Sequence, residues 1–163
     1  MGRATGTVPA MSLPRLVVPI LLMLALLLGG CASRPTPDHL ELRQHIVETA
    51  LGQLGRPYRY GGRDPDGFDC SGLVQFAYSE AGVIVPRDTR SQREAGKSLS
   101  LSKAQPGDLL FYRFENGGGL HVGLYLGDGR MIHAPASGRQ VSLVEVASPI
   151  WKKRYLETIR LLQ

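Results

Sequence analysis

Residues 68–78 read Phe-Asp-Cys-Ser-Gly-Leu-Val-Gln-Phe-Ala-Tyr, and the rest of the chain is organised around them. Leu73 and Ala77 lie one helical turn apart, which indicates an amphipathic helix. Asp69 or Ser71 can cap the start of that helix. The stretch therefore predicts a helix with Cys70 in its first turn.

A cysteine in this position is a candidate nucleophile. A thiol at a helix N-terminus meets the positive end of the helix dipole and backbone N–H groups that lack partners, and both favour the thiolate. The alternative is that Cys70 is a small buried apolar residue, as free cysteines often are. The stretch alone leaves both interpretations open.

The composition indicates one ordinary globular domain. The chain has 163 residues and 43% hydrophobic residues. Its 19 basic residues include Arg3 and Arg15, which lie in a segment expected to be removed; 17 basic and 14 acidic residues remain, a net charge of +3. This charge is too small and too scattered to indicate a nucleic-acid partner.

Residues 1–30 are predicted to form a signal peptide. Residues 16–28 are an uncharged, mostly apolar run that follows Arg15 and is too short for a standard transmembrane helix. Met11 is an alternative start, because Arg15 would still supply the charged leader. An uncleaved membrane anchor or a core segment remains the other interpretation of the run.

The run ends in Leu-Gly-Gly-Cys at residues 28–31, which resembles a lipobox, the motif whose cysteine is diacylated and becomes the first mature residue. Ala32 follows Cys31, and in Gram-negative lipoproteins a residue other than Asp at this place implies the outer membrane. We therefore expect a lipid anchor at Cys31, a short tether over residues 31–38, and a domain over residues 39–163 that faces the periplasm.

The folded domain is predicted to be α+β. Helices are expected from Asp38 to about Leu54, after Asp69, and from Thr89 as the capping residue. Strands follow at residues 109–112, 120–126, 131–134, 141–146 and 155–161. Helices that precede antiparallel strands predict a small sheet with helices packed on one side.

Two histidines in the strand-rich half are candidates for the base that a cysteine nucleophile needs. A three-residue loop at residues 127–129 would place His133 opposite Gly123, on the same strand face as His121. Gly123 would then leave space beside both rings. Either histidine, taken alone, could equally be a strand residue without a catalytic role.

Two other arrangements of these residues are possible. Cys70, His121 and His133 could supply three zinc ligands, but no Cys-x-x-Cys or His-x-x-x-His pair is present to seed such a site, and no metal is expected. Cys31 and Cys70 could form a disulfide, which lipidation of Cys31 would exclude.

Four motifs together resemble the NlpC/P60 family of cell-wall cysteine peptidases. They are Asp-Cys-Ser-Gly-Leu-Val at 69–74, Pro-Gly-Asp-Leu at 106–109, His-Val-Gly-Leu-Tyr-Leu-Gly at 121–127 and Ile-His-Ala at 132–134. With the lipobox, the chain is most similar to the Gram-negative lipoprotein members, the Spr-type murein endopeptidases. The resemblance implies a papain-like α+β fold with the nucleophile at a helix N-terminus.

The resemblance also implies roles for individual residues. Cys70 matches the nucleophile, His121 the general base and His133 the polar residue that holds the His121 ring. Tyr58 matches a tyrosine that helps to bind the oxyanion, with Tyr60 as the alternative. Frequent cleft positions without an assigned catalytic role are Asp69, Ser71, Arg87 and Gln92.

The implied activity is hydrolysis of amide bonds in peptidoglycan stem peptides, without a cofactor and by a monomer. The D-Ala–diaminopimelate cross-link is favoured over the D-Glu–diaminopimelate bond. Arg56, Arg59 and Arg63 could meet stem carboxylates or form a solvated loop. A non-catalytic cell-wall-binding lipoprotein and a thiol enzyme acting on another amide are the rival interpretations.

Overall fold

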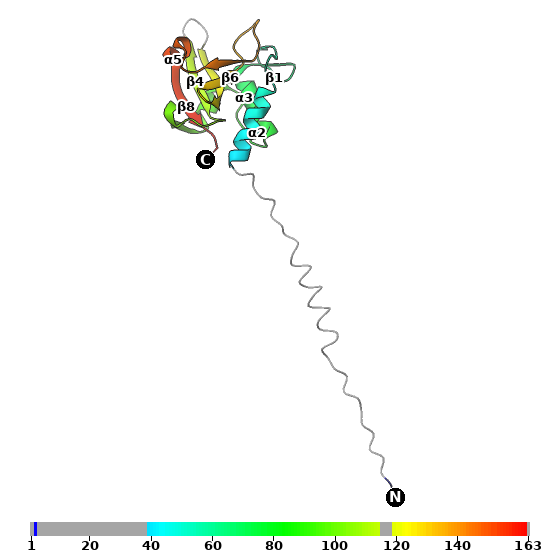
Figure 1. The fold of residues 1–163 in the computed structure, drawn as a ribbon. Coiled ribbons are helices and arrows are strands. Elements are labelled where there is room, and N and C mark those ends of the chain that lie inside the picture. Colours follow the sequence, from blue (N-terminus) through cyan, green and yellow to red (C-terminus); the bar gives the residue numbers. More distant parts are fainter. Residues whose placement is uncertain (1, 3–38, 115–118, 163) are drawn as a thin grey trace. The chain divides into compact units, whose positions relative to one another are not determined.

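The computed structural model describes residues 2, 39–114 and 119–162 (Figure 1). Apart from Gly2, the predicted signal peptide lies outside the described residues, as do the alternative start at Met11, the lipidation site at Cys31 and the tether. Among the helices of the described part, none has the length and apolar character needed to cross a membrane.

The domain contains two small sheets and four α-helices among its described residues. The helices are α2 (His39–Leu51), α3 (Cys70–Glu80), α4 (Thr89–Glu94) and α5 (Pro149–Arg154), with a 3-10 turn at Leu101–Lys103. The strands are β1 (Arg63–Asp64), β2 (Gly67–Phe68), β3 (Lys97–Leu99), β4 (Leu109–Phe114), β5 (Gly119–Gly127), β6 (Arg130–His133), β7 (Ser142–Glu145) and β8 (Tyr155–Arg160). The predicted α+β class is confirmed.

The main sheet is antiparallel throughout and has the order β3-β8-β4-β5-β6-β7. β4 and β5 lie at its centre, and β1 pairs with β2 in a separate small hairpin. This order places the two histidine-bearing strands, β5 and β6, side by side. β3 was not expected from the sequence.

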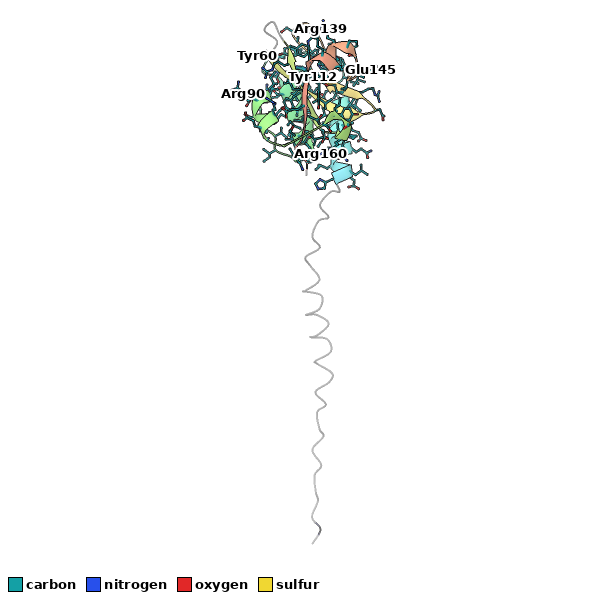
Figure 2. The ribbon with its side chains drawn as sticks, turned by 90° about the vertical axis from the view of Figure 1, so that its left-hand side faces the viewer. Tyr60, Arg90, Tyr112, Arg139, Glu145 and Arg160 are labelled. Atoms are coloured by element: carbon teal, nitrogen blue, oxygen red, sulfur yellow. The ribbon has the colours of Figure 1, made fainter. Side chains whose placement is uncertain are left out.

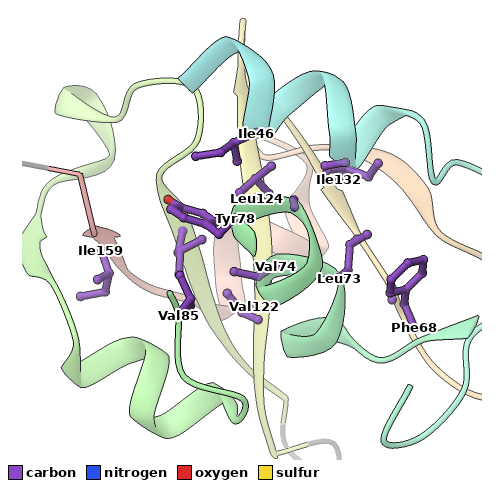
Figure 3. Packing of buried hydrophobic residues seen from close by; sticks show 14 of the residues in the cluster. Ile46, Phe68, Leu73, Val74, Tyr78, Val85, Val122, Leu124, Ile132 and Ile159 are labelled. Atoms are coloured by element: carbon purple, nitrogen blue, oxygen red, sulfur yellow. The ribbon is translucent and has the colours of Figure 1, made fainter. Parts of the chain in front are cut away.

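One face of the main sheet packs against α2 and α3. Leu73 and Val74 of α3 belong to the same core cluster as Val122 and Leu124 of β5, and all four side chains are almost completely buried. Figure 3 shows Val74 beside Val122. The alternating pattern at residues 120–126 is therefore correct, because Val122 and Leu124 face this core while His121 faces away from it.

The other face carries a smaller buried cluster made of Leu110, Tyr112, Met131, Val146 and Trp151. Trp151 comes from α5, which covers this face and was not predicted. The expectation that helices cover only one side of the sheet is therefore wrong.

Two helix boundaries also differ from the predictions. α2 ends at Leu51 rather than near Leu54, which is 43% exposed and precedes a turn at Gly55 with φ of +80°. Asp88 rather than Thr89 caps α4, since its carboxylate accepts a hydrogen bond from the Ser91 backbone N–H at 3.0 Å.

A buried ion cluster ties the first helix to the sheet. Asp108, completely buried at the start of β4, lies 3.0 Å from Arg43 of α2 and 2.7 Å from Arg160 of β8. Arg43 also donates a hydrogen bond to the backbone oxygen of Leu162. A buried carboxylate needs such partners, because an unpaired charge in the interior is very unfavourable.

Candidate active site

Cys70 is the first residue of α3, as the sequence predicts. Asp69 caps the helix: its carboxylate accepts a 2.7 Å hydrogen bond from the Gly72 N–H. A Cβ at Gly72 would lie 2.0 Å from the backbone oxygen of Gly62, so only glycine lets the segment before β1 approach the helix start this closely. The glycine after Cys70-Ser71 thus brings that segment beside the thiol.

Cys70, His121 and Tyr58 line one open cleft of about 500 Å³. Three separate parts of the chain supply them: the start of α3, strand β5 and the loop before β1. The other lining residues are Tyr60, Gly61, Asp69, Ser71, Arg87, Asp88, Thr89, Leu120 and Pro135. The structure therefore brings together the predicted nucleophile, base and oxyanion-binding tyrosine.

The hairpin of β5 and β6 has the predicted register. Leu124 pairs with Ile132 and Tyr125 with Met131, so His133 follows on the face that also carries His121. The Nε2 atom of His121 lies 2.9 Å from the Nδ1 atom of His133, within hydrogen-bond distance. The prediction that the two imidazoles share a face is confirmed.

The turn that produces this register is not the expected three-residue loop. Gly127 pairs with Arg130, so the turn proper is Asp128-Gly129, and both of its residues have positive φ, +51° and +75°. A bulge between Tyr125 and Gly127 adds the residue that restores the register.

Gly123 also lies against a side chain of the neighbouring strand. A Cβ at this position would lie 2.6 Å from the Met131 sulfur, so the glycine leaves room for Met131.

Aromatic side chains enclose the two imidazoles. The Trp151 ring lies 4.8 Å from the His133 ring in an edge-on arrangement and 5.9 Å from the His121 ring, and Phe114 lies 5.8 Å from His121. Burial lowers the pKa of both histidines. The neighbouring His133 lowers the pKa of His121 further, and the charge of Arg139 lowers the pKa of His133 further. Both rings are therefore neutral at neutral pH.

The thiol of Cys70 does not have the lowered pKa expected from its position at a helix start. Burial raises its pKa, and this outweighs the Thr89 hydroxyl, 3.7 Å from the sulfur, and the Val122 backbone, which both lower it. The cleft is thus lined at rest by a neutral thiol and a neutral imidazole. Such a pair requires the imidazole to accept the thiol proton during attack.

The contact between the histidines suits that requirement. If the Nε2–H of His121 donates to Nδ1 of His133, the Nδ1 atom of His121 keeps its lone pair and can accept a proton. Such an arrangement can provide a base together with a group that orients it.

Tyr58 is held beside Cys70 by the backbone. Its N–H donates to the Arg139 oxygen at 2.8 Å, and it forms an isolated bridge with Phe68. Burial and then the neighbouring Cys70 raise its pKa, so the phenol stays protonated and can donate a hydrogen bond. Tyr60 also lines the cleft and is 90% exposed.

The remaining predicted cleft positions form a network of hydrogen bonds with the residues next to Cys70. Arg87 contacts both carboxylate oxygens of Asp69, at 2.9 and 2.6 Å, and donates to the Ser71 hydroxyl at 2.9 Å. Gln92 is completely buried and donates to the backbone oxygen of Ser71. These contacts fix the residues on either side of Cys70.

Other predicted contributors lie elsewhere. Arg56, Arg59 and Arg63 are absent from the cleft lining, and Arg59 forms an exposed ion pair with Asp64 at 2.8 Å. Within residues 39–114 and 119–162, no three His, Cys, Asp or Glu side chains are grouped as metal ligands.

Two neighbours of the site are not predicted as such by the sequence. The sequence indicates Thr89 only as a helix start, although its hydroxyl lies 3.7 Å from the Cys70 sulfur. Trp151 is the single tryptophan of the chain, and a Ser148-Pro149 helix start precedes it. That start signal could have revealed α5, but the contact of Trp151 with the histidines depends on the fold.

The chain is similar to known proteins in both sequence and fold. Residues 55–160 match the model of the NlpC/P60 family. The chain is 39% identical over 121 residues to a gamma-D-glutamyl-L-lysine dipeptidyl-peptidase of Bacillus subtilis. The matched region covers 73% of this chain and 41% of that protein. It is 38% identical over 125 residues to the murein DD-endopeptidase/murein LD-carboxypeptidase MepS of Escherichia coli, covering 76% of this chain and 65% of that protein.

A crystal structure of an NlpC/P60 family protein from Bacillus cereus superposes with a TM-score of 0.70 at 34% identity, over 79% of this chain and 42% of that one. This chain therefore spans less than two thirds of the length of these relatives. The family model covers more than half of the chain, from the segment before the thiol to the last strand. The protein belongs to the NlpC/P60 family.

Proposed function

We propose that this protein is a cysteine-type peptidoglycan endopeptidase that cleaves amide bonds of murein stem peptides. One observation carries the proposal. His121 lies 2.9 Å from His133 and lines the same cleft as Cys70, which is the first residue of a helix. A binding module needs neither a nucleophile nor an oriented base.

The proposed mechanism assigns one step to each residue. The Cys70 thiol attacks the amide carbonyl as its proton passes to His121, and the protonated ring is stabilised by its contact with His133. The backbone N–H of Cys70 and the Tyr58 hydroxyl bind the oxyanion. His121 then protonates the leaving amine, and it later deprotonates the water that hydrolyses the acyl-enzyme.

The cross-link between D-Ala and diaminopimelate is the bond we propose first, because the lipobox resemblance points to the Spr-type enzymes. The D-Glu–diaminopimelate bond is the alternative. The similarity to a gamma-D-glutamyl-L-lysine dipeptidyl-peptidase at 39% and to a murein DD-endopeptidase at 38% does not distinguish them.

We further propose that Cys31 is lipidated and holds the protein on the periplasmic side of the outer membrane. The support is the Leu-Gly-Gly-Cys sequence at 28–31 after an apolar run, with Ala32 following the cysteine. A lipid anchor of several acyl chains gives firm membrane attachment.

Digestion of cross-linked peptidoglycan tests the activity. Purified protein and its Cys70→Ala variant are incubated with the polymer, and the fragments are identified by mass spectrometry. Conversion of cross-linked dimers to monomers with intact stems indicates the D-Ala–diaminopimelate bond, whereas shortened stems indicate the D-Glu–diaminopimelate bond.

The Cys70→Ala variant is expected to give neither product while still binding peptidoglycan. Equal products from both proteins would refute the thiol mechanism. Binding without any Cys70-dependent product would favour a non-catalytic cell-wall-binding lipoprotein.

A further inference from the structure

Two adjacent grooves lie at the end of the domain where α2 begins. The first, of about 570 Å³, has a mainly apolar lining that includes Leu40, Val47, Pro106 and Leu126. Leu40 is 70% exposed, so its apolar side chain is available for contact with a partner. We call the two grooves together the α2-end surface.

The second groove, of about 730 Å³, is basic. Lys97 and Lys103 are exposed at it, and Arg43 and Arg160 lie within it. The grooves share His39, Arg43 and Gln105, so the apolar and basic parts are continuous.

The charge of the α2-end surface is positive. Neither groove is lined by any Asp or Glu. Asp108, which lies between Arg43 and Arg160, is completely buried and balances one of these two charges, so the surface keeps a formal charge of about +3 with both lysines. The cleft, by contrast, is lined by Asp69 and Asp88 with one arginine.

The α2-end surface and the cleft lie at different ends of the domain. Figure 2 shows Arg160, which lines the basic groove, at the opposite end from Tyr60, which lines the cleft. A partner bound at the α2-end surface therefore leaves the cleft open.

The proposed lipid anchor is close to this surface in the chain. Cys31 and His39 are separated by residues 32–38, and a fully extended segment of this length spans about 28 Å. A domain of this size is about 35 Å across. An anchored domain must therefore keep its His39 end within less than its own width of the lipid.

We propose that the α2-end surface docks onto an anionic phospholipid bilayer and turns the cleft away from the membrane. Lys97 and Lys103 meet the phosphates of the headgroups, and Leu40 enters the interfacial region. The inference rests on the proposed lipid anchor at Cys31. It accounts for how a tethered enzyme presents its cleft to a polymer beyond the membrane surface.

A spin-label experiment on the full lipidated protein tests this docking. Leu40→Cys or Tyr60→Cys is labelled with a nitroxide in a Cys70→Ala background, where the thioether at Cys31 does not react. The protein is reconstituted in vesicles of phosphatidylethanolamine with a minor fraction of phosphatidylglycerol. The label at position 40 is expected to lie in the lipid and to be accessible to oxygen rather than to a water-soluble nickel complex. The label at position 60 is expected to lie in water and to be accessible to the nickel complex.

The lysines are tested by Lys97→Gln together with Lys103→Gln in the labelled Leu40→Cys protein. The ratio of docked to undocked label is expected to fall about 25-fold, roughly fivefold for each charge removed. Lys152→Gln with Lys153→Gln, two exposed lysines of α5, is the matched control and should leave the ratio unchanged.

Two results of these experiments would overturn the docking inference. A label at position 40 that is as aqueous as the one at position 60 would overturn the docking inference, as would equal effects of the two lysine pairs. Mass spectrometry of the same protein reports the lipid on Cys31, and its absence would overturn both anchor and docking. Peptidoglycan digestion, measured separately, would be untouched by either failure.

Discussion

On one face of the main sheet, Val122 and Leu124 of β5 pack against α3; on the other, His121 of the same strand packs against Trp151 of α5. The first face belongs to an extended apolar core, whereas the second buries a smaller cluster of aliphatic and aromatic side chains together with a pair of imidazoles. Neighbouring residues of one strand thus face different surroundings.

Under the proposed mechanism, this difference separates residues that stabilise the fold from residues that take part in catalysis along a single strand. Val122 and Leu124 on the core face stabilise the fold because they are buried. The other face holds two buried imidazoles, which the proposed mechanism needs neutral and oriented, and Trp151 packs against both rings. Substitutions on the two faces of β5 should therefore fail in different ways.

His121→Gln should produce the largest effect, a loss of about 10³-fold in kcat/KM, because a glutamine side chain cannot accept the thiol proton. The free energy of unfolding should change by no more than about 1 kcal/mol, since the apolar core is untouched. Digestion rates and urea denaturation measure the two quantities. An equally large loss of stability would mean that His121 is mainly a structural residue.

Leu124→Ala should show the opposite behaviour. Leu124 is completely buried in the core, and truncation of such a side chain costs about 2–5 kcal/mol of unfolding free energy. Urea denaturation measures the cost. The rate per folded molecule should stay within about threefold of the parent, and a much slower folded enzyme would show that the two faces are coupled.

Local patterns were sufficient to predict much of the fold. The helix after Asp69 and the alternation along β5 are visible in the sequence because helices and strands repeat with fixed periods. The common face of His121 and His133 followed from strand geometry, although a bulge rather than a longer loop produces it. Periodicity alone does not fix this register, because the predicted register also depended on the assumed length of the turn.

Features that depend on distant contacts could not be predicted in this way. α5 is only six residues long, too short for a periodic signal, yet it carries the tryptophan that covers the histidines. The ion cluster of Arg43, Asp108 and Arg160 joins residues that are far apart in the chain. The raised pKa of Cys70 likewise reflects burial, which a helix-start argument ignores.

His133 offers a smaller and more specific test of the aromatic face. His133→Ala removes the partner of the His121 Nε2 atom and should lower kcat/KM about 10²-fold. His133→Asn supplies an oxygen that can accept the same N–H, so it should stay within about tenfold of the parent. Peptidoglycan digestion compares the two variants, and equal losses would mean that His133 contributes packing rather than orientation.

Trp151 should affect the pH dependence more than the rate itself. Burial lowers the pKa of His121, so the proposed base should stay unprotonated, and active, below the ordinary histidine pKa of about 6.5. Trp151→Ala admits water to the pair and should move the acid limb of kcat/KM upward, toward that value. Trp151→Phe keeps an aromatic cover and should leave the limb near its original position.

The imidazole chemical shifts, followed by NMR across the same pH range, report the two histidine pKa values independently of turnover. They also show whether Trp151→Ala remains folded, which matters because loss of a buried tryptophan can cost about 3–5 kcal/mol. A folded Trp151→Ala protein with unchanged histidine pKa values would show that the rest of the sheet face, and not Trp151, excludes water. The neutral resting pair of thiol and imidazole would then depend on Phe114 and the strands themselves.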